Sequence, residues 1–407
     1  MIARGVTASL VPLLMLTCAT AQDAPPLEIL RAIASKLEQK PAPTGIVFKP
    51  APSAAAPNAC PMQPFDMALT RNGDPVRTYS VMLDRQANES SPKPKQILAV
   101  ITRVAVDADG SARAYHPEDP EGERTCTRTT GRDGKFHPQG ICALDKFSSG
   151  RMALYKDADR LTKDNLVAEW KDAWPLIRDK KLKPVDLRSL VPEAPDGYYF
   201  FHWRERNLTA FFKRFIVPQS KDGYPCRHGA ESPFAGYFVA ATTLNHNAPA
   251  RADGCAPARY IDAETIPFFV LPKGGFGDVR IGDVMVARMT KGGVERTVFG
   301  IIADAGPPGQ FGEGSVALNA ALLGKADVPV MNMKETWALD IEGPPVTVLV
   351  IGGTRGLLKG DYSKKNIEAV ARAEFSRWGG HDPMRQFNAC AAAAKVNLKC
   401  DATRDRC

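Results

Sequence analysis

Two acidic residues nine positions apart stand out in the segment ADAGPPGQFGEGS. Asp304 and Glu313 have only Gly, Pro, Gln, Ser and small or apolar neighbours there, and no Lys or Arg occurs at residues 297–324. Hydrolysis of a glycosidic bond requires one protonated carboxyl group for the leaving oxygen and one ionised carboxylate that activates water or attacks the sugar. Because no cation would hold these acids ionised, we expect Phe311 and an apolar surrounding to keep Glu313 protonated near neutral pH.

The loop between these two acids must fold back if both are to act on one bond. Fully extended, a chain of this length spans about 30 Å, whereas inverting glycosidases hold their two carboxyl groups about 6.5 to 9.5 Å apart. The Gly and Pro residues at 306–309 and Gly312 favour the turns that this requires. The same composition is typical of a surface loop whose acids only face water, so the sequence leaves both interpretations open.

A second acidic group lies in the segment VDADGS. It begins like a calcium-binding loop, but Ala112 stands where that loop requires glycine for its sharp turn, so we reject this interpretation. From Gln96 onward, apolar and polar residues alternate on both sides of the DADG turn, which predicts a β-hairpin. Asp107 and Asp109 would then lie at the hairpin tip, next to Tyr115.

The composition is that of a globular protein, because 407 residues with 44% hydrophobic and 24% charged types allow one large or two ordinary domains. Arg4, the apolar run VTASLVPLLML and the small residues ending at Ala21 predict a secretory signal. Cys18 leaves a lipoprotein signal as an alternative, although Thr17 is a poor residue for that site. No later apolar run approaches the ~20 residues that span a bilayer. We therefore expect a secreted protein, extracellular or periplasmic, with no transmembrane segment.

Removal of the signal leaves eight of the nine cysteines, an even number that indicates disulfides in an exported protein. Pairs between sequence neighbours, Cys126 with Cys142 and Cys226 with Cys255, are plausible, but eight cysteines allow many other connectivities. No CxxC pair and no HExxH motif occurs. We therefore expect no zinc site, no other metal and no cofactor.

The formal net charge of +8 falls by one to +7 when the signal is removed, because Arg4 is the only charged residue within it. A basic excess of this size favours attraction to acidic surfaces such as cell wall or lipid headgroups. The Lys and Arg residues are dispersed, without a basic stripe that contains aromatic residues, so nucleic acid is not an expected partner.

Periodicity predicts a β-rich core with a few peripheral helices and no sustained βαβ alternation. Helical spacing occurs in PLEILRAIASKLEQK, in residues 162–174, which Pro175 is expected to end, and in residues 363–378. Runs of aromatic and β-branched residues predict strands in DGYYFFHW, AGYFVAATTL, TIPFFVLP, GDVMVARM, RTVFGIIADAG and PVTVLVIGG.

Four parts follow one another along the chain. They are a signal peptide at 1–21, an N-terminal helix and Pro/Ala-rich linker at 22–94, a catalytic domain at 95–380 and a Cys-containing C-terminal tail at 381–407. The linker assignment depends on residues 40–61, whose Pro and Ala residues stiffen the chain and offer little to bury.

Several segments together resemble family 75 of the glycoside hydrolases, the chitosanase family first known from fungi. They occur in the family's order between about Gln96 and Gly356 and comprise VDADGSARAYHP, GYFVAATTL, RYIDAETIPFFVLP, IGDVMVA, IIADAGPPGQFGEGSVALNAALLG and a strand that ends in GGT. The specific part is the pair Asp-x-Gly-Pro and Gly-Glu-x-Ser. Residues 119–235 show little beyond hydrophobic character.

The resemblance implies that Asp304 and Glu313 are the two essential acids of an inverting enzyme, with Glu313 as general acid and Asp304 as general base. It implies a secreted, monomeric, endo-acting glycosidase that hydrolyses β-1,4 linkages of chitosan or a related amino-sugar polymer. Four further residues are candidates for substrate binding: Asp107, Asp109, Tyr260 and Asp262. Acids among them would suit glucosamine ammonium groups, although strand packing and a turn explain the last two residues equally well.

The segment from Gly282 to Gly324 is also similar to the double-psi β-barrel of rare lipoprotein A and related wall-acting proteins. There too a strand ends at an Asp followed by Gly-Pro, and a small helix follows. This similarity implies a mainly β fold with peripheral helices around a double-psi β-barrel-like core. It also implies an alternative function, either a lytic enzyme acting on peptidoglycan or a non-catalytic protein that binds cell wall or sugar.

Overall fold

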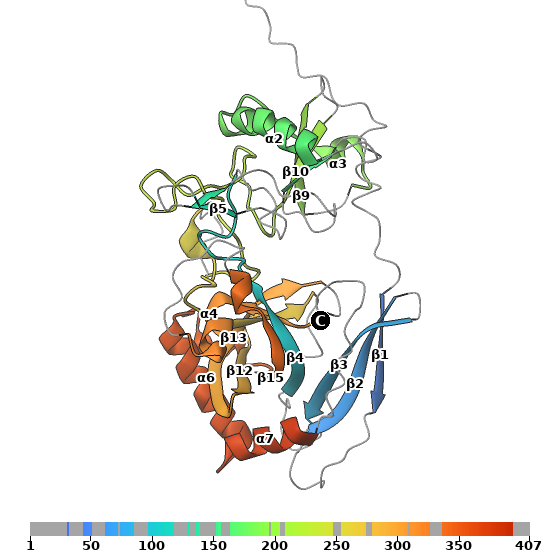
Figure 1. Ribbon diagram of the computed structural model, residues 1–407, viewed down its shortest axis with the longest axis vertical. Coiled ribbons are helices and arrows are strands. Elements are labelled where there is room, and N and C mark those ends of the chain that lie inside the picture. Colours follow the sequence, from blue (N-terminus) through green and yellow to red (C-terminus); the bar gives the residue numbers. More distant parts are fainter. Residues whose placement is uncertain are drawn as a thin grey trace, which may run out of the picture.

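The computed structural model describes residues 31, 44–50, 62–71, 74–84, 97–117, 128–130, 136–138, 152–155, 163–194, 197–203, 208–246, 254–273, 279–307, 310–325 and 336–393. The architecture is mainly β with a few helices, as the sequence predicts. Two parts follow each other along the long axis of the molecule, a larger barrel and a smaller sheet with its own helices (Figure 1).

Six strands of the larger part close into a barrel. Around the ring they are β4 (Ile97–Asp107), β14 (Glu313–Ser315), β11 (Phe268–Pro272), β13 (Val294–Gly306), β12 (Val284–Lys291) and β15 (Ile341–Ile351). The ring closes because β15 pairs with β4 as well as with β12. The strand predictions for TIPFFVLP, GDVMVARM, RTVFGIIADAG and PVTVLVIGG are confirmed as β11, β12, β13 and β15.

Successive side chains of the barrel strands point into two different hydrophobic clusters, as the period of a strand requires. Val286 of β12 belongs to a cluster with α6 (Lys364–Gly379) and α7 (Pro383–Ala393). Its neighbour Met285 belongs to a second cluster with α4 (Val316–Leu323). Both faces of the strands are therefore buried, which explains their nearly continuous apolar sequences.

The helix predicted at 363–378 is confirmed as α6, whose first turn is capped by the Ser363 hydroxyl accepting a hydrogen bond from the Asn366 amide at 3.3 Å. The tail predicted at 381–407 includes α7, which buries Phe387 and Cys390 against the barrel. The described residues also form three short 3-10 helices: η1 (Pro257–Arg259), η2 (Trp337–Leu339) and η3 (Arg355–Leu358).

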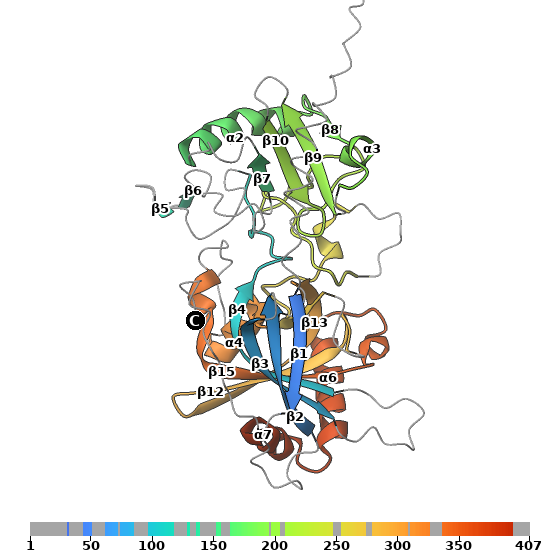
Figure 2. The same cartoon turned by 90° about the vertical axis from the view of Figure 1, so that its right-hand side faces the viewer.

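Three further strands extend the sheet beyond the barrel: β1 (Thr44–Pro50), β2 (Met62–Arg71) and β3 (Asp74–Asp84). β3 pairs with the first half of β4, and β1 is the edge strand (Figure 2). The segment at 40–61, interpreted as a linker or a surface wrap, contains the edge strand β1, and the one proline within this strand, Pro50, is its last residue. Of the helix predicted before it, only Arg31 is described, and it is helical.

The smaller part is a four-stranded sheet in the order β7 (Met152–Tyr155), β10 (Leu208–Lys213), β9 (Tyr198–Trp203) and β8 (Pro184–Val185), accompanied by α2 (Lys163–Arg178) and α3 (Leu187–Leu190). The prediction for DGYYFFHW is confirmed as β9. A separate pair consists of β5 (Arg128–Thr130) and β6 (Phe136–Pro138).

One hydrophobic cluster joins the two parts. It contains Phe201, Phe212 and Trp170 of the smaller part together with Val106 of β4 and Val316 of α4. The chain leaves the barrel after β4, runs through the smaller part and returns before β11 (Figures 1 and 2). The end of β4 is therefore buried between the two parts.

Three local predictions are wrong. No hairpin follows β4, because β4 pairs with the preceding strand β3 and with β14 and β15, which come from distant parts of the chain. The segment AGYFVAATTL forms only an isolated bridge between Phe238 and Arg227, not a strand. Helix α2 continues past Pro175 to Arg178, and this last turn buries Ile177 in the joining cluster.

Cys226 and Cys255 form a disulfide, which confirms one of the two pairs considered from the sequence. Cys390 is disulfide-bonded as well. Cys126, Cys142 and the predicted signal peptide lie outside the described residues. None of the helices in the described ranges is long and apolar enough to cross a membrane.

Candidate functional site

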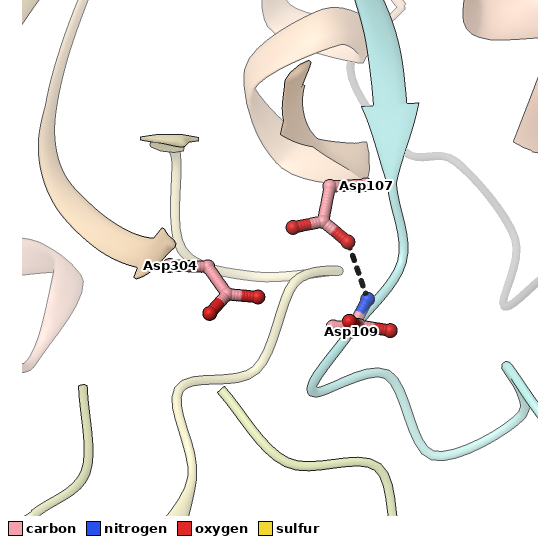
Figure 3. A group of neighbouring side chains, drawn as sticks. All are labelled: Asp107, Asp109 and Asp304. Carbon is pink, nitrogen blue, oxygen red and sulfur yellow. Dashed lines mark hydrogen bonds between the residues drawn. The ribbon is translucent and has the colours of Figure 1, made fainter. Parts of the chain in front are cut away.

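Three aspartates meet where the smaller part packs onto the barrel (Figure 3). Asp304 lies in β13, opposite Val270 of β11. Asp107 is the last residue of β4, and Asp109 follows in the turn. One carboxylate oxygen from each lies within 4.8 Å of the others, although each residue is only 7% exposed. The structure thus brings three of the six predicted site residues into one buried cluster.

The turn after β4 is held in one conformation by close contacts. The Asp109 amide donates to Asp107 Oδ1 at 3.0 Å, and the Tyr115 hydroxyl donates to Asp109 Oδ1. Gly110 has a φ of 92°, and a Cβ atom there would lie 2.0 Å from the carbonyl oxygen of Ile261. Only glycine fits this position, because both the positive φ and the close backbone exclude a side chain.

The Asp304 carboxylate is anchored through one oxygen. Oδ1 accepts hydrogen bonds from the Thr243 amide at 2.9 Å, the Thr243 hydroxyl at 2.5 Å and the Ala305 amide at 2.8 Å. Thr243 comes from the segment that returns from the smaller part to the barrel. Both parts of the molecule therefore contribute to the surroundings of Asp304.

Burial and mutual repulsion raise the proton affinity of this cluster. Burial, followed by the charge of Asp109, raises the pKa of Asp304 to about 7, against the hydrogen bonds from Thr243 and Ala305, which lower it. The pKa of Asp107 is raised well above its ordinary value by burial first, then by the charges of Asp109, Asp304 and Glu313. Carboxylates this close cannot all remain ionised without cost, so the cluster holds protons near neutral pH.

Glu313 begins β14, where it pairs in register with Ala105 of β4. Its charge acts on Asp107, and a Cβ atom at Gly306 would lie 3.2 Å from Glu313 Oε2. Its side chain is exposed, whereas Phe311 is buried in the cluster that contains α4. The expectation that Phe311 and an apolar surrounding enclose Glu313 is therefore wrong.

The side chains of Tyr260 and Asp262 form hydrogen bonds with residues outside the aspartate cluster. The Tyr260 hydroxyl donates to the Gly254 carbonyl at 2.8 Å. Asp262 accepts from the Glu264 amide at 2.9 Å and from the Thr265 hydroxyl at 2.8 Å, so it stabilises its own turn. Their role in substrate binding stays a prediction, and the carbonyl oxygen of the intervening Ile261 lies against Gly110 in the turn after β4.

A hard divalent cation would also neutralise three converging carboxylates, since Ca²⁺ and Mg²⁺ take oxygen ligands. Asp107, Asp109 and Asp304 offer three oxygen ligands within 4.8 Å of one another, and water completes the coordination of such ions in many proteins. The absence of a metal, expected from the sequence, stays a prediction.

Sequence reasoning missed Thr243 and the contact of Tyr115 with Asp109. Tyr115 follows the DADG turn closely enough to attract notice, and Thr243 lies in a segment that suggested a strand. The Thr243 contact does not follow from local spacing, because Thr243 is 61 residues away from Asp304. No protein-family model matches the sequence, and no curated protein matches it significantly.

Proposed function

We propose that this protein is a glycoside hydrolase that cleaves β-1,4 linkages of chitosan or a related amino-sugar polymer with inversion, using Asp304 and Glu313. The observation that carries this proposal is the contrast between the two acids: Asp304 is buried with a pKa raised to about 7, and Glu313 is exposed. They lie on β13 and β14, the two neighbours of β11. Strands two positions apart lie about 9 to 10 Å apart, near the carboxyl separation of inverting enzymes, about 6.5 to 9.5 Å.

In this reaction the protonated carboxyl of Asp304 transfers its proton to the glycosidic oxygen as the bond from that oxygen to the anomeric carbon breaks. Glu313 takes a proton from the water whose oxygen forms the new bond to the anomeric carbon. One water is consumed, and exchange with solvent returns Asp304 to its acid and Glu313 to its base form. These roles are the reverse of those that the family resemblance implies, because the buried acid holds a proton most readily.

Three observations support the finer parts of the proposal. The parallel pairings of β11 with β13 and β14 with β4 support a barrel of the double-psi type. The acidic cluster and the absence of Lys and Arg from residues 297–324 support a cationic sugar as substrate. The disulfide between Cys226 and Cys255 supports secretion, since disulfides persist in oxidising compartments.

The test is product release from chitosan by the wild type, Glu313→Gln and Asp304→Asn. We expect each variant to lose at least about 100-fold in the rate of reducing-end release, the usual contribution of a positioned acid or base. Circular dichroism must show an unchanged fold, and NMR of fresh products should show inversion at the anomeric carbon. Full activity of either variant contradicts the assignment of that residue.

The alternatives give different results with chitosan, chitin and peptidoglycan compared side by side by mass spectrometry. Anhydro-sugar products from peptidoglycan would indicate a lytic enzyme. Retention on insoluble glycan without any cleavage product would indicate a binding protein. Either outcome refutes the proposed hydrolase.

A further inference from the structure

The three hydrogen bonds to Asp304 decide which of its oxygens is able to react. All three donors, two from Thr243 and one from Ala305, end on Oδ1. A carboxyl oxygen has two lone pairs, so an oxygen that already accepts three hydrogen bonds has no room for a proton of its own. The proton of neutral Asp304 must therefore lie on Oδ2, to which no described residue donates a hydrogen bond.

A second aspartate of the barrel shows what the same arrangement does without a reactive role. Asp283 Oδ1 accepts from the Thr354 amide at 2.8 Å and the Arg355 amide at 3.0 Å, whereas the Thr354 hydroxyl donates to the Ile351 carbonyl at 2.7 Å. Its Oδ2 accepts from the Arg280 amide at 2.8 Å. Both oxygens of Asp283 are occupied by backbone donors, whereas Asp304 keeps one oxygen for chemistry.

We propose that Thr243 is a positioning residue that turns the Asp304 carboxyl so that Oδ2 is the atom that exchanges the catalytic proton. This inference rests on the proposed function. It adds to that function a residue of the segment that connects the two parts of the molecule.

The backbone around Thr243 is fixed from both sides, as positioning requires. The Ala241 amide donates to the Ile216 carbonyl in the smaller part at 2.8 Å, and the Leu244 amide donates to the Ala303 carbonyl in β13 at 2.8 Å. The Thr243 side chain itself is exposed, so replacing it removes a hydrogen bond without removing buried packing.

The charged groups that act on Asp304 come from neighbouring elements. Asp107 and Asp109 face it from the end of β4 and the following turn, and Glu313 of β14 acts on Asp107. After burial, the charge of Asp109 is what raises the pKa of Asp304 and so opposes its ionisation. The Thr243 donors act in the other direction, because they stabilise the ionised form.

The experiment compares Thr243→Val, which removes the hydroxyl, with Thr243→Ser, which keeps it, using chitosan as substrate. For Thr243→Val we expect kcat to fall about 10- to 100-fold, the range for a hydrogen bond to a charged group, with KM changed less than about twofold. The alkaline limb of the kcat–pH profile, which reports the loss of the Asp304 proton, should move to higher pH. Thr243→Ser should restore both values to within about threefold of the wild type.

Thr265→Val is the matched control, because it removes another exposed threonine–aspartate hydrogen bond, to Asp262. We expect it to leave kcat and the pH profile unchanged. A Thr243→Val enzyme with wild-type kcat, or with a loss that Thr243→Ser does not restore, overturns the positioning role while Asp304→Asn still supports the proposed function. A wild-type protein that does not cleave chitosan refutes both.

Discussion

Asp283 and Asp304 are both buried in the barrel, and both accept the amide of a threonine on Oδ1. The two aspartates differ in what surrounds their second carboxylate oxygen, Oδ2. Asp283, 1% exposed, has its other oxygen bound by the Arg280 amide, so it connects β12 to the loop after β15. Asp304 instead faces Asp107 and Asp109 (Figure 3). A threonine amide thus fixes an aspartate in place in both regions, and only Asp304 lies within 4.8 Å of two other carboxylates.

A glycine of positive φ stands beside an aspartate in both regions. Gly282 (φ 94°) precedes Asp283, and Gly110 (φ 92°) follows Asp109. At Gly110 an added Cβ would meet the backbone of Ile261, whereas at Gly282 it would meet side-chain carbons of Arg355 at 2.8 Å. The contact at the candidate site is therefore the more rigid of the two.

The largest expected difference between the two regions is in activity. Asp304→Asn should lower the rate of chitosan hydrolysis about 1,000-fold, since an amide cannot supply the proton. Asp283→Asn should keep kcat but lower the free energy of unfolding by about 1 to 3 kcal/mol, because its amide nitrogen cannot accept from the Arg280 amide. Reducing-end assays and urea unfolding measure these effects. An inactive but stable Asp283→Asn protein would remove the distinction between the two aspartates.

The next effect is on the pH dependence of stability. Burial raises the pKa of Asp304 from 3.8 to about 7, so between these values the folded protein binds a proton that the unfolded chain does not. Stability therefore falls as pH rises through this window, by an upper limit of roughly 4 kcal/mol. Asp304→Asn should remove much of this fall, and Asp107→Asn, whose pKa is also raised, should act in the same direction.

Urea unfolding at pH 4 and pH 8 measures this dependence, with Asp283→Asn as the buried control. The two cluster variants should gain stability relative to the wild type at pH 8 and little at pH 4. Equal changes at both pH values would show that repulsion within the cluster does not destabilise the protein.

The smallest of the three effects concerns the two glycines. Gly110→Ala should lower the free energy of unfolding by about 3 kcal/mol and reduce hydrolysis, because the turn that carries Asp109 must move away from Ile261. Gly282→Ala should cost about 1 kcal/mol with unchanged kcat, because the Arg355 side chain is able to move aside. Thermal unfolding and chitosan assays compare them. A costlier Gly282→Ala would contradict the rigid contact at Gly110.

Local patterns predicted the elements whose stability is local or whose sequences are strongly apolar. The runs that became β11, β12, β13 and β15 are rich in β-branched and aromatic residues, and α6 has helical spacing after a capping serine. The hairpin after β4 was mispredicted because β4 pairs instead with strands such as β15, far along the chain. The strand β1 was missed because it lies inside a Pro- and Ala-rich segment, although its partner β2 is the next strand. Pairing across long stretches of sequence leaves no local signal.

For the site, the sequence by itself determined which residues are able to do acid–base chemistry, namely Asp304, Glu313, Asp107 and Asp109. It also suggested two disulfide pairs, of which the structure shows Cys226–Cys255. Only the tertiary structure decided that the three aspartates are buried together and that Glu313 is exposed. It also decided that Thr243 leaves one oxygen of Asp304 for the proton. The physical reason is that desolvation, charge separation and hydrogen-bond direction depend on distances between residues far apart in the chain, which the order of residues does not contain.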